Sequence, residues 1–299
     1  MSHLQMFFLV LVLGTFQAQA DFSVVAIGDT GKGNPDQYRV GAALARECKS
    51  VQCTFALLLG DNIYDEGISS PQDPQMIEKF EKPYADLEVP FYVALGNHDY
   101  GKKANDWKRG DAQVAYSKFS KKWILPSHYY SFEHENTLFI VLDTSRLFHN
   151  KDTDKQLKFV RDTLAKNTKK WVVVVAHHPY LSNGKHGNAG KYDGVPISPY
   201  SGKIIKDLVE KDLCAKMDLF ISGHDHSLQT LLGSQKCPKP LFVVSGGGAS
   251  VREDLEGKNP VHFQKDVLGF TTLKFTDSQM TITHINVDGL TEHSISVQK

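Results

Sequence analysis

The feature that most constrains this chain is a repeated pattern in which an apolar run ends in a side chain able to bind a metal ion. Four runs end in glycine followed at once by Asp, Asn or His, and a fifth ends directly in His. These run ends are Gly28-Asp29, Gly60-Asp61, Gly96-Asn97, Gly223-His224 and Ala176-His177. Runs that are apolar throughout are typical of strands buried on both faces. Because ligand sites in open α/β sheets gather at the carboxyl ends of the strands, the pattern predicts that these side chains meet in one site.

Strand-like and helix-like segments alternate along the chain, which favours an α/β layered fold with largely parallel strands. The expected strands are 23–28, 55–60, 91–96, 138–142, 171–176, 219–223 and 241–245, and the expected helices are about 36–49, 74–87, 111–124, 154–167 and 201–213. Two alternating segments, 270–275 and 280–287, predict a hairpin at a sheet edge. No linker or low-complexity tract is visible, so we expect one domain over 21–299.

The charge balance excludes some classes of protein. The chain has 34 Lys and Arg residues against 34 Asp and Glu residues, and 41% of its residues are hydrophobic. It is therefore too apolar to be disordered. It also lacks the basic field that binds nucleic acid by bulk charge, so we expect no nucleic-acid partner of that kind.

The N-terminus has the pattern of a secretory signal peptide over 1–20. An apolar run, 6–13, precedes an A-x-A site at Ala18 to Ala20, although no Lys or Arg precedes the run. The alternatives are a buried first strand or a membrane anchor. The run is too short to span a bilayer, and no second stretch is long enough, so we expect no membrane anchor after cleavage. The predicted destination is secretion or a lysosomal or vacuolar lumen.

Export permits disulfide bonds, and the four cysteines allow three pairings. We favour Cys48–Cys53 and Cys214–Cys237, because each pair closes a local connection between a helix and a strand. The alternative is four buried thiols. The cysteines lack the paired spacing of a zinc site, so we expect no metal role for them.

The run-end side chains suit two adjacent metal ions. Mixtures of carboxylate and imidazole are typical ligands of Fe, Mn and Zn. Two ions about 3.5–4 Å apart can clamp a phosphate and supply a bound hydroxide as nucleophile. We expect Asp61 to bridge the ions, and we expect His224 and His226, on one short connection, to reach a different ion each.

Five motifs in fixed order carry a resemblance to a known family. They are GDTG (28–31), GDNIY (60–64), GNHD (96–99), AHHP (176–179) and GHDH (223–226). In this order they resemble the calcineurin-like metallophosphoesterases. Tyr64 and the chain length are similar to the purple acid phosphatases of the small tartrate-resistant kind. The resemblance covers nearly all of the chain from Asp21 and implies a four-layer α/β/β/α sandwich with mixed sheets.

The resemblance also implies a ligand set. Fe(III) would be held by Asp29, Asp61, Tyr64 and His226. A second, divalent ion (Fe(II), Zn or Mn) would be held by Asp61, Asn97, His177 and His224. His177 is preferred to His178 as the ligand because in the family the ligand stands two residues before the proline, here Pro179. The role of His178 stays open.

The same resemblance implies roles for the remaining polar side chains. Asn97, His98 and His186 would bind the phosphate, a metal-bound hydroxide would attack phosphorus, and His98 or, preferably, His186 would protonate the leaving group. Segment 144–154 is shorter than the repression loop of mammalian members and has no Cys. We therefore expect neither proteolytic nor redox control there, because the segment is too short to cover the site.

The expected function is that of a secreted, monomeric acid phosphatase acting on phosphomonoesters. A metallophosphodiesterase or nucleotidase on the same scaffold is the first alternative, and Tyr64 argues against it because most such relatives lack a tyrosine there. The second alternative is a non-catalytic secreted protein that binds metal or phosphate. The presence of both the ligand set and the two further histidines argues against that alternative.

Overall fold

The computed structural model describes residues 21–197 and 200–299. The predicted signal segment, 1–20, therefore lies outside the described residues. Within the described part, no helix is both long enough and apolar enough to cross a membrane.

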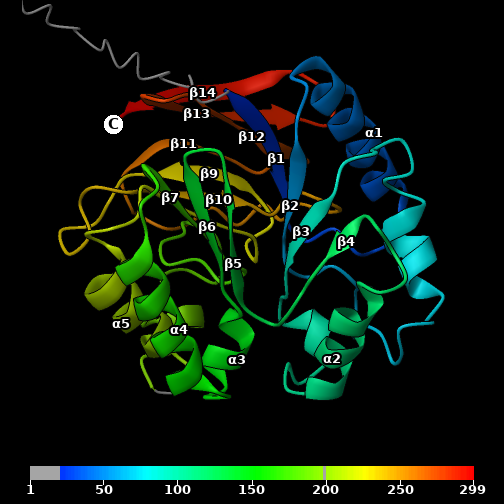
Figure 1. Ribbon diagram of the computed structural model, residues 1–299, viewed down its shortest axis with the longest axis horizontal. Helices are drawn as coiled ribbons and strands as arrows, with labels where there is room; N and C mark the ends of the chain where they lie inside the picture. Colours follow the sequence, from blue (N-terminus) through cyan, green and yellow to red (C-terminus); the bar gives the residue numbers. More distant parts are fainter. Residues whose placement is uncertain (1–20, 198–199) are drawn as a thin grey trace, which may run out of the picture.

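Two sheets of seven strands form the centre of the molecule (Figure 1). The first sheet has the order β14-β13-β12-β1-β2-β3-β4, with β1 Phe22–Ile27, β2 Phe55–Leu59, β3 Phe91–Ala94, β4 Trp123–Ile124, β12 Gly269–Phe275, β13 Gln279–Asn286 and β14 Thr291–Gln298. The second sheet has the order β11-β9-β10-β8-β7-β6-β5, with β5 Tyr130–His134, β6 Thr137–Val141, β7 Trp171–Val175, β8 Leu219–Ser222, β9 Leu228–Leu231, β10 Leu241–Ser245 and β11 Val261–Lys265.

Both sheets are mixed. Strands β1 to β4 are parallel, as are β6, β7, β8 and β10, while the remaining neighbours pair antiparallel. The sequence prediction of largely parallel strands thus holds for the centre of each sheet. The implied architecture with mixed sheets is confirmed.

Side-chain alternation in the second sheet separates two apolar layers. Val173 and Ile221 face the first sheet and join the large core between the sheets, while Val174 and Phe220 face the other way. The outward set packs against α3 (Thr144–Phe148), α4 (Thr153–Lys166) and α5 (Lys203–Leu208), and α1 (Pro35–Ser50) lies against the first sheet (Figure 1). This is the α/β/β/α layering.

Three predicted helices differ from the structure. Segment 74–87 contains only a π-helical turn, Ile77–Glu81, because Pro83 cannot continue a helix. In segment 111–124 the helix α2 is Trp107–Tyr116, and residues 123–124 form β4, which pairs with β3 instead. Segment 201–213 divides into α5 and a π-helical turn, Val209–Leu213.

The predicted C-terminal hairpin forms between β12 and β13, but it does not lie at the sheet edge. Strand β14 pairs outside it, and β12 pairs with β1 on the other side. The sequence analysis missed β14, β11, β9, β5 and β4. Strands β11 and β14 are partly exposed along most of their length, so they lack the fully apolar run that marked the others.

Both predicted disulfide bonds are present in the structure. Cys48 at the end of α1 is bonded to Cys53 before β2, with the Cα atoms 4.8 Å apart. Cys214 after α5 is bonded to Cys237 before β10, with the Cα atoms 5.2 Å apart. The first bond closes the connection between α1 and β2, as the sequence analysis expected, whereas the loop closed by the second bond contains the strands β8 and β9.

A buried carboxyl group, Asp143, caps the short helix α3. Its side chain accepts a hydrogen bond from the backbone N–H of Arg146 at 2.9 Å and another from the hydroxyl of Tyr100. Asp143 is fully buried, and this burial raises its pKa to about 7, although both hydrogen bonds oppose the rise. The native state therefore holds this proton more tightly than the unfolded chain does.

We expect loss of the Cys214–Cys237 bond to be the more destabilising of the two disulfide removals. The bonds join residues 23 and 5 positions apart. In the chain-entropy model, removal should lower the free energy of unfolding by about 3 and about 2 kcal/mol, respectively. Urea unfolding of the double variants Cys214→Ala/Cys237→Ala and Cys48→Ala/Cys53→Ala measures both values. An unchanged midpoint in both variants would contradict the expectation.

Asp143 should make the protein lose stability as the pH rises from about 4 to about 7. Below the unfolded-state pKa of about 3.9 both states are protonated and the stabilisation is complete, and it is lost as the pH passes through the folded-state value of about 7. One group can contribute up to roughly 1.4 kcal/mol per pH unit in this window. Asp143→Asn cannot ionise and should flatten this part of the pH profile in thermal unfolding, whereas the exposed control Asp288→Asn should not. Equal slopes for Asp143→Asn and the unmodified protein would refute the assignment.

Candidate metal and phosphate site

The predicted side chains meet where the central strands of both sheets end. Asp29, Asp61 and Asn97 follow β1, β2 and β3, and His177 and His224 follow β7 and β8. Glycines allow this close approach. A Cβ atom on Gly60 would lie 2.5 Å from His177 Nδ1, and one on Gly96 would lie 2.2 Å from Asp61 Oδ1. These glycines therefore leave the room that the functional side chains occupy.

Three of the predicted ligands have left-handed backbone conformations. The φ angles are 59° at Asp29, 53° at Asp61 and 73° at His224. Such conformations are unfavourable for residues other than glycine and cluster at functional sites, where the surrounding structure maintains them. The strand ends thus turn sharply so that each side chain points into the site.

One half of the site is formed by Asp29, Tyr64 and His226. The Tyr64 hydroxyl lies 3.1 Å from Asp29 Oδ1 and 3.1 Å from His226 Nε2. The other ring nitrogen of His226, Nδ1, lies 2.8 Å from Ser250 Oγ. With Nδ1–H donating to that hydroxyl, the lone pair of Nε2 faces Asp29 and Tyr64, which is the orientation of a metal ligand.

The other half is formed by Asn97, His177 and His224. His177 Nε2 lies 3.0 Å from Asn97 Oδ1 and 3.1 Å from His224 Nδ1. His177 Nδ1 lies 2.9 Å from the carbonyl oxygen of Leu59 and must donate to it. The Nε2 lone pair of His177 therefore points toward Asn97 Oδ1 and His224 Nδ1, two further atoms that can act as metal ligands.

Asp61 lies between the two halves. Its Oδ1 atom is 3.4 Å from His177 Nε2, and its charge also acts on the Tyr64 hydroxyl on the other side. Ligand atoms of Asp29, Asp61 and His177 all lie within 4.8 Å of one another. The middle position that the sequence analysis expected for Asp61 is therefore the position it occupies.

The electrostatics of the cluster fit positive ions. Asp29 and Asp61 are 0% and 2% exposed, and in residues 21–197 and 200–299 neither lies within salt-bridge distance of a Lys or Arg. Buried carboxylates are costly unless paired with a cation or a metal. Burial and the charges of both carboxylates raise the pKa of Tyr64 well above its usual value, so a phenolate here needs a nearby cation.

The two further histidines lie at opposite ends of the cluster. His98 lies beside the Tyr64 half: its Nδ1 atom is 2.9 Å from the carbonyl oxygen of Asp65, and its ring centroid is 4.5 Å from that of Tyr64. His186 lies beside the other half, with its ring centroid 4.2 Å from that of His224. Both therefore adjoin the donor cluster, as the sequence analysis expected.

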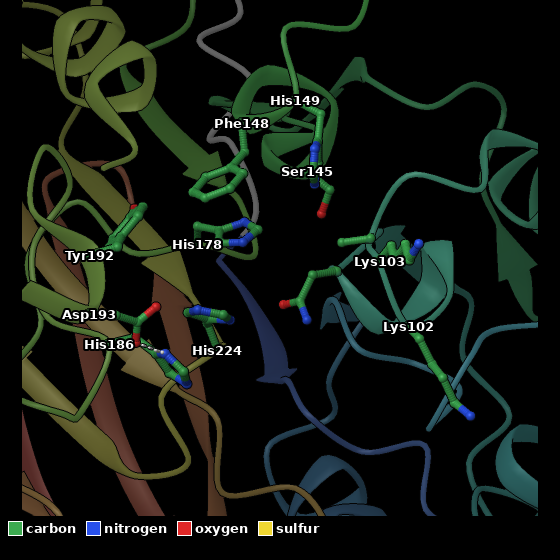
Figure 2. A pocket seen from close by; sticks show the side chains of 12 residues that line it. Lys102, Lys103, Ser145, Phe148, His149, His178, His186, Tyr192, Asp193 and His224 are labelled. Carbon is green, nitrogen blue, oxygen red and sulfur yellow. Dashed lines mark hydrogen bonds and ion pairs between the residues drawn. The ribbon is translucent and has the colours of Figure 1, made fainter. Parts of the chain in front are cut away.

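A cavity of about 300 Å³ opens beside the second half of the site (Figure 2). We call it the α3 cavity, because α3 forms one of its walls. It is lined by Asn97, Lys102, Lys103, Ala104, Ser145, Phe148, His149, His178, His186, Tyr192, Asp193 and His224. Segment 144–154 was expected to be too short to cover the site. In the structure it does reach the site, through Phe148 and His149, and contributes a wall.

His178, whose role the sequence left open, lies in this wall. The Thr144 hydroxyl accepts a hydrogen bond from the His178 backbone N–H at 3.0 Å and lies 2.9 Å from Nδ1 of the same ring. The Thr144 hydroxyl can donate its proton in a hydrogen bond to His178 Nδ1. The neutral ring then carries its own proton on Nε2, which faces the cavity. Burial and the positive charges of neighbouring histidines lower the pKa of His178 well below its usual value, so the ring is neutral.

Sequence reasoning missed several residues that contact the site. Asp193 Oδ1 accepts a hydrogen bond from His186 Nδ1 at 2.8 Å (Figure 2), and Arg252 Nη1 lies 3.4 Å from His186 Nε2. Lys32 Nζ donates to Ser250 Oγ at 2.7 Å and lies 5.3 Å from the Tyr64 ring centroid. These residues lie on connections whose positions depend on tertiary contacts. For Asp193 a sequence signal exists, because it lies in a long loop, 183–200, that is rich in Gly, Asn and Pro.

Comparisons with known proteins agree with this geometry. The model of a family described as calcineurin-like phosphoesterase matches residues 22–228. The chain is 28% identical to a tartrate-resistant acid phosphatase type 5 of Sus scrofa, over 89% of this chain and 83% of that protein. It is 27% identical to purple acid phosphatase 4 of Arabidopsis thaliana, over 93% and 84% of the two chains. The resemblance drawn from the five motifs is thereby confirmed.

A solved structure shares the fold. GAP50, described as the anchor in the inner membrane complex of Plasmodium, superposes with a TM-score of 0.75 at 20% identity, covering 93% of this chain and 89% of that one. At this identity the similarity establishes the architecture alone.

Proposed function

This chain belongs to the calcineurin-like phosphoesterase family, and we propose that it is a secreted acid phosphatase that hydrolyses phosphomonoesters at a two-metal centre. One observation carries the proposal. Two groups of side-chain oxygen and nitrogen atoms of the kinds that bind metal ions converge on either side of the buried Asp61 carboxylate. The acid phosphatase names of the relatives support the same activity.

The two halves of the site differ in the ion they suit. Asp29, Asp61, Tyr64 and His226 combine two carboxylates with a phenolic oxygen, a hard and anionic set that favours Fe(III). The neutral Asn97, His177 and His224 suit a divalent ion, either Fe(II), Zn or Mn, with Asp61 shared. When bound, such a pair supplies positive charge for the phosphate oxygens and an activated water for attack at phosphorus.

The chain's own side chains then bind and orient the ester. Asn97, in the second half, and His98, beside the Tyr64 half, can hold phosphate oxygens, and His98 is itself oriented by the Asp65 carbonyl. His186 approaches from the other side, with its Nδ1 atom donating to Asp193. Because Nδ1–H is held by Asp193, the imidazolium form of His186 would pass the proton on Nε2 to the leaving oxygen, and Arg252 Nη1, 3.4 Å from Nε2, would have to move away for this step.

The location and the assembly state are part of the same proposal. Segment 1–20 is the signal peptide, residues 21–299 are one phosphoesterase domain, and the exported protein is a monomer. Export is supported by the two disulfide bonds, which form in oxidising compartments.

A non-catalytic role is one alternative; the fold is shared with a protein described as an anchor, but that similarity concerns the architecture alone. The argument against it is that the candidate metal donors, Asn97 among them, occur together with His98 and His186, two histidines that a protein binding only metal would not need. A diesterase or nucleotidase on the same scaffold is opposed by Tyr64, whose hydroxyl faces His226 and Asp29.

The purified protein should contain two metal ions per chain, at least one of them iron, and show a broad visible absorption band from phenolate bound to Fe(III). Tyr64→Phe should abolish the band and keep the fold, because it removes the phenolic oxygen that contacts Asp29 and His226. The control is Tyr38→Phe on the exposed side of α1, which should keep the band. Metal analysis with visible spectroscopy tests both parts. A colourless protein containing only Zn or Mn would remove the ferric assignment.

Replacing His186 by Ala should lower kcat by roughly 10²-fold or more on alkyl phosphates, whose leaving group needs a proton. The loss should be much smaller on p-nitrophenyl phosphate, since p-nitrophenolate leaves without protonation. Steady-state kinetics with both esters measures the difference, and His262→Ala, an exposed histidine in β11, is the control. Equal losses on the two esters would deny His186 the role of proton donor.

A further inference from the structure

The α3 cavity has a wall for which the chemistry proposed above has no use. Asn97, His186 and His224 belong to the metal and phosphate site, but Ser145, Phe148, Tyr192 and Lys103 do not (Figure 2). A phosphoryl group held at the metal site would place the rest of the ester in this cavity. The wall is therefore positioned to select the leaving group.

The Ser145 hydroxyl is the strongest sign that the cavity binds something. Ser145 is 1% exposed, and its Oγ atom has no hydrogen-bond partner in the described part of the chain. Figure 2 shows this oxygen directed toward the open space. Of the described residues that line the cavity, none other has a buried side-chain polar atom without a partner. Such groups are costly unless a partner arrives, and a ligand atom can be that partner.

The apolar part of the wall consists of aromatic rings. The Phe148 ring stacks on His178, with centroids 5.6 Å apart and planes 10° apart, and Tyr192 packs behind both rings at 5.9 Å from His178 and 6.3 Å from Phe148. The Thr144 contacts fix His178 in place. A flat, rigid aromatic surface of this kind favours contact with another ring.

The charge on the opposite side of the cavity is positive. Lys102 is paired with Glu66 at 3.0 Å, but Lys103 is exposed and lies within salt-bridge distance of no carboxylate among residues 21–197 and 200–299. The volume of about 300 Å³ is at the lower end of the range for small-molecule sites, so it suits one ring rather than a nucleoside.

We propose that the α3 cavity is a leaving-group subsite for aryl phosphates whose single ring carries a hydrogen-bond acceptor such as a carboxylate. The ring of the leaving group packs on Phe148. Its acceptor atom accepts a hydrogen bond from the Ser145 hydroxyl and faces Lys103. The proposal rests on the proposed function for the position of the phosphoryl group. It adds two specificity-determining residues, Ser145 and Phe148, that contact only the leaving group.

Binding of non-hydrolysable phosphonates to the metal-loaded protein tests the subsite directly. Titration calorimetry should show phenylphosphonate binding roughly tenfold more tightly than methylphosphonate, from burial of the ring. The more tightly bound of 3- and 4-phosphonobenzoate should gain a further factor of about 3 to 10, the range for one added hydrogen bond. Equal affinities for methyl- and phenylphosphonate would overturn the proposal.

Two variants separate the ring contact from the polar contact. Phe148→Ala should bring the phenyl-to-methyl affinity ratio close to one and raise KM for phenyl phosphate more than it changes kcat. Ser145→Ala should keep that ratio but abolish the gain from the carboxylate. Its melting temperature should not fall, because the hydroxyl makes no hydrogen bond to any described residue. The control Phe119→Ala, at a side chain 59% exposed, should change none of these values. A carboxylate gain that survives Ser145→Ala, or a phenyl-to-methyl ratio that survives Phe148→Ala, would refute the assigned contact.

Methylphosphonate and simple esters distinguish the two levels of the argument. If methylphosphonate binds and esters are hydrolysed while the aryl preference is absent, the subsite fails and the phosphatase function stands. If no phosphonate binds and no ester is hydrolysed by the metal-loaded protein, the proposed function fails.

Discussion

The structure is organised around two carboxylates, Asp29 and Asp61, for which the described residues provide no Lys or Arg partner. Both are buried. Their oxygens accept hydrogen bonds from the backbone N–H groups of His224 and His98, and histidine nitrogens and the Tyr64 phenol lie close by. Burying such charges without compensation opposes folding. The strand ends nevertheless keep both residues in left-handed conformations that hold the carboxylates in place. A fold that bears this cost twice is one in which bound metal ions supply the missing positive charge.

The sequence was most informative where a residue's position follows from a buried strand. Each strand with an apolar run and a following Asp, Asn or His was recognisable, because double-sided burial leaves an unmistakable composition. The carboxyl ends of neighbouring parallel strands must then meet, which brings Asp29, Asp61 and Asn97 together. The pairing of Cys48 with Cys53 followed from the same reasoning, since both flank one short connection.

The sequence was least informative where tertiary contacts outweigh local preference. Trp123 was assigned to a helix, but its backbone pairs with Phe91 in β3 and its indole N–H donates to the carbonyl oxygen of Gln113. Asp193 and Arg252 could not be linked to His186 from the sequence, because they lie on irregular connections with no periodic pattern. Likewise, nothing in the composition of segment 144–154 indicates that Phe148 would stack on a histidine beside the metal donors.

The strand order of the first sheet has a consequence for how the protein becomes active. Strand β1, which carries Asp29, lies between β2 and β12, so Phe22 near the start of the described chain pairs with Phe275 near its end. A chain emerging from the ribosome presents β1 long before its second neighbour exists, and such long-range pairings form slowly. The strand that leads to Asp29 therefore gains its second neighbour only after every other residue of the donor cluster, up to His226, has been synthesised. Completion of the first sheet and completion of the donor cluster are thus coupled through β1.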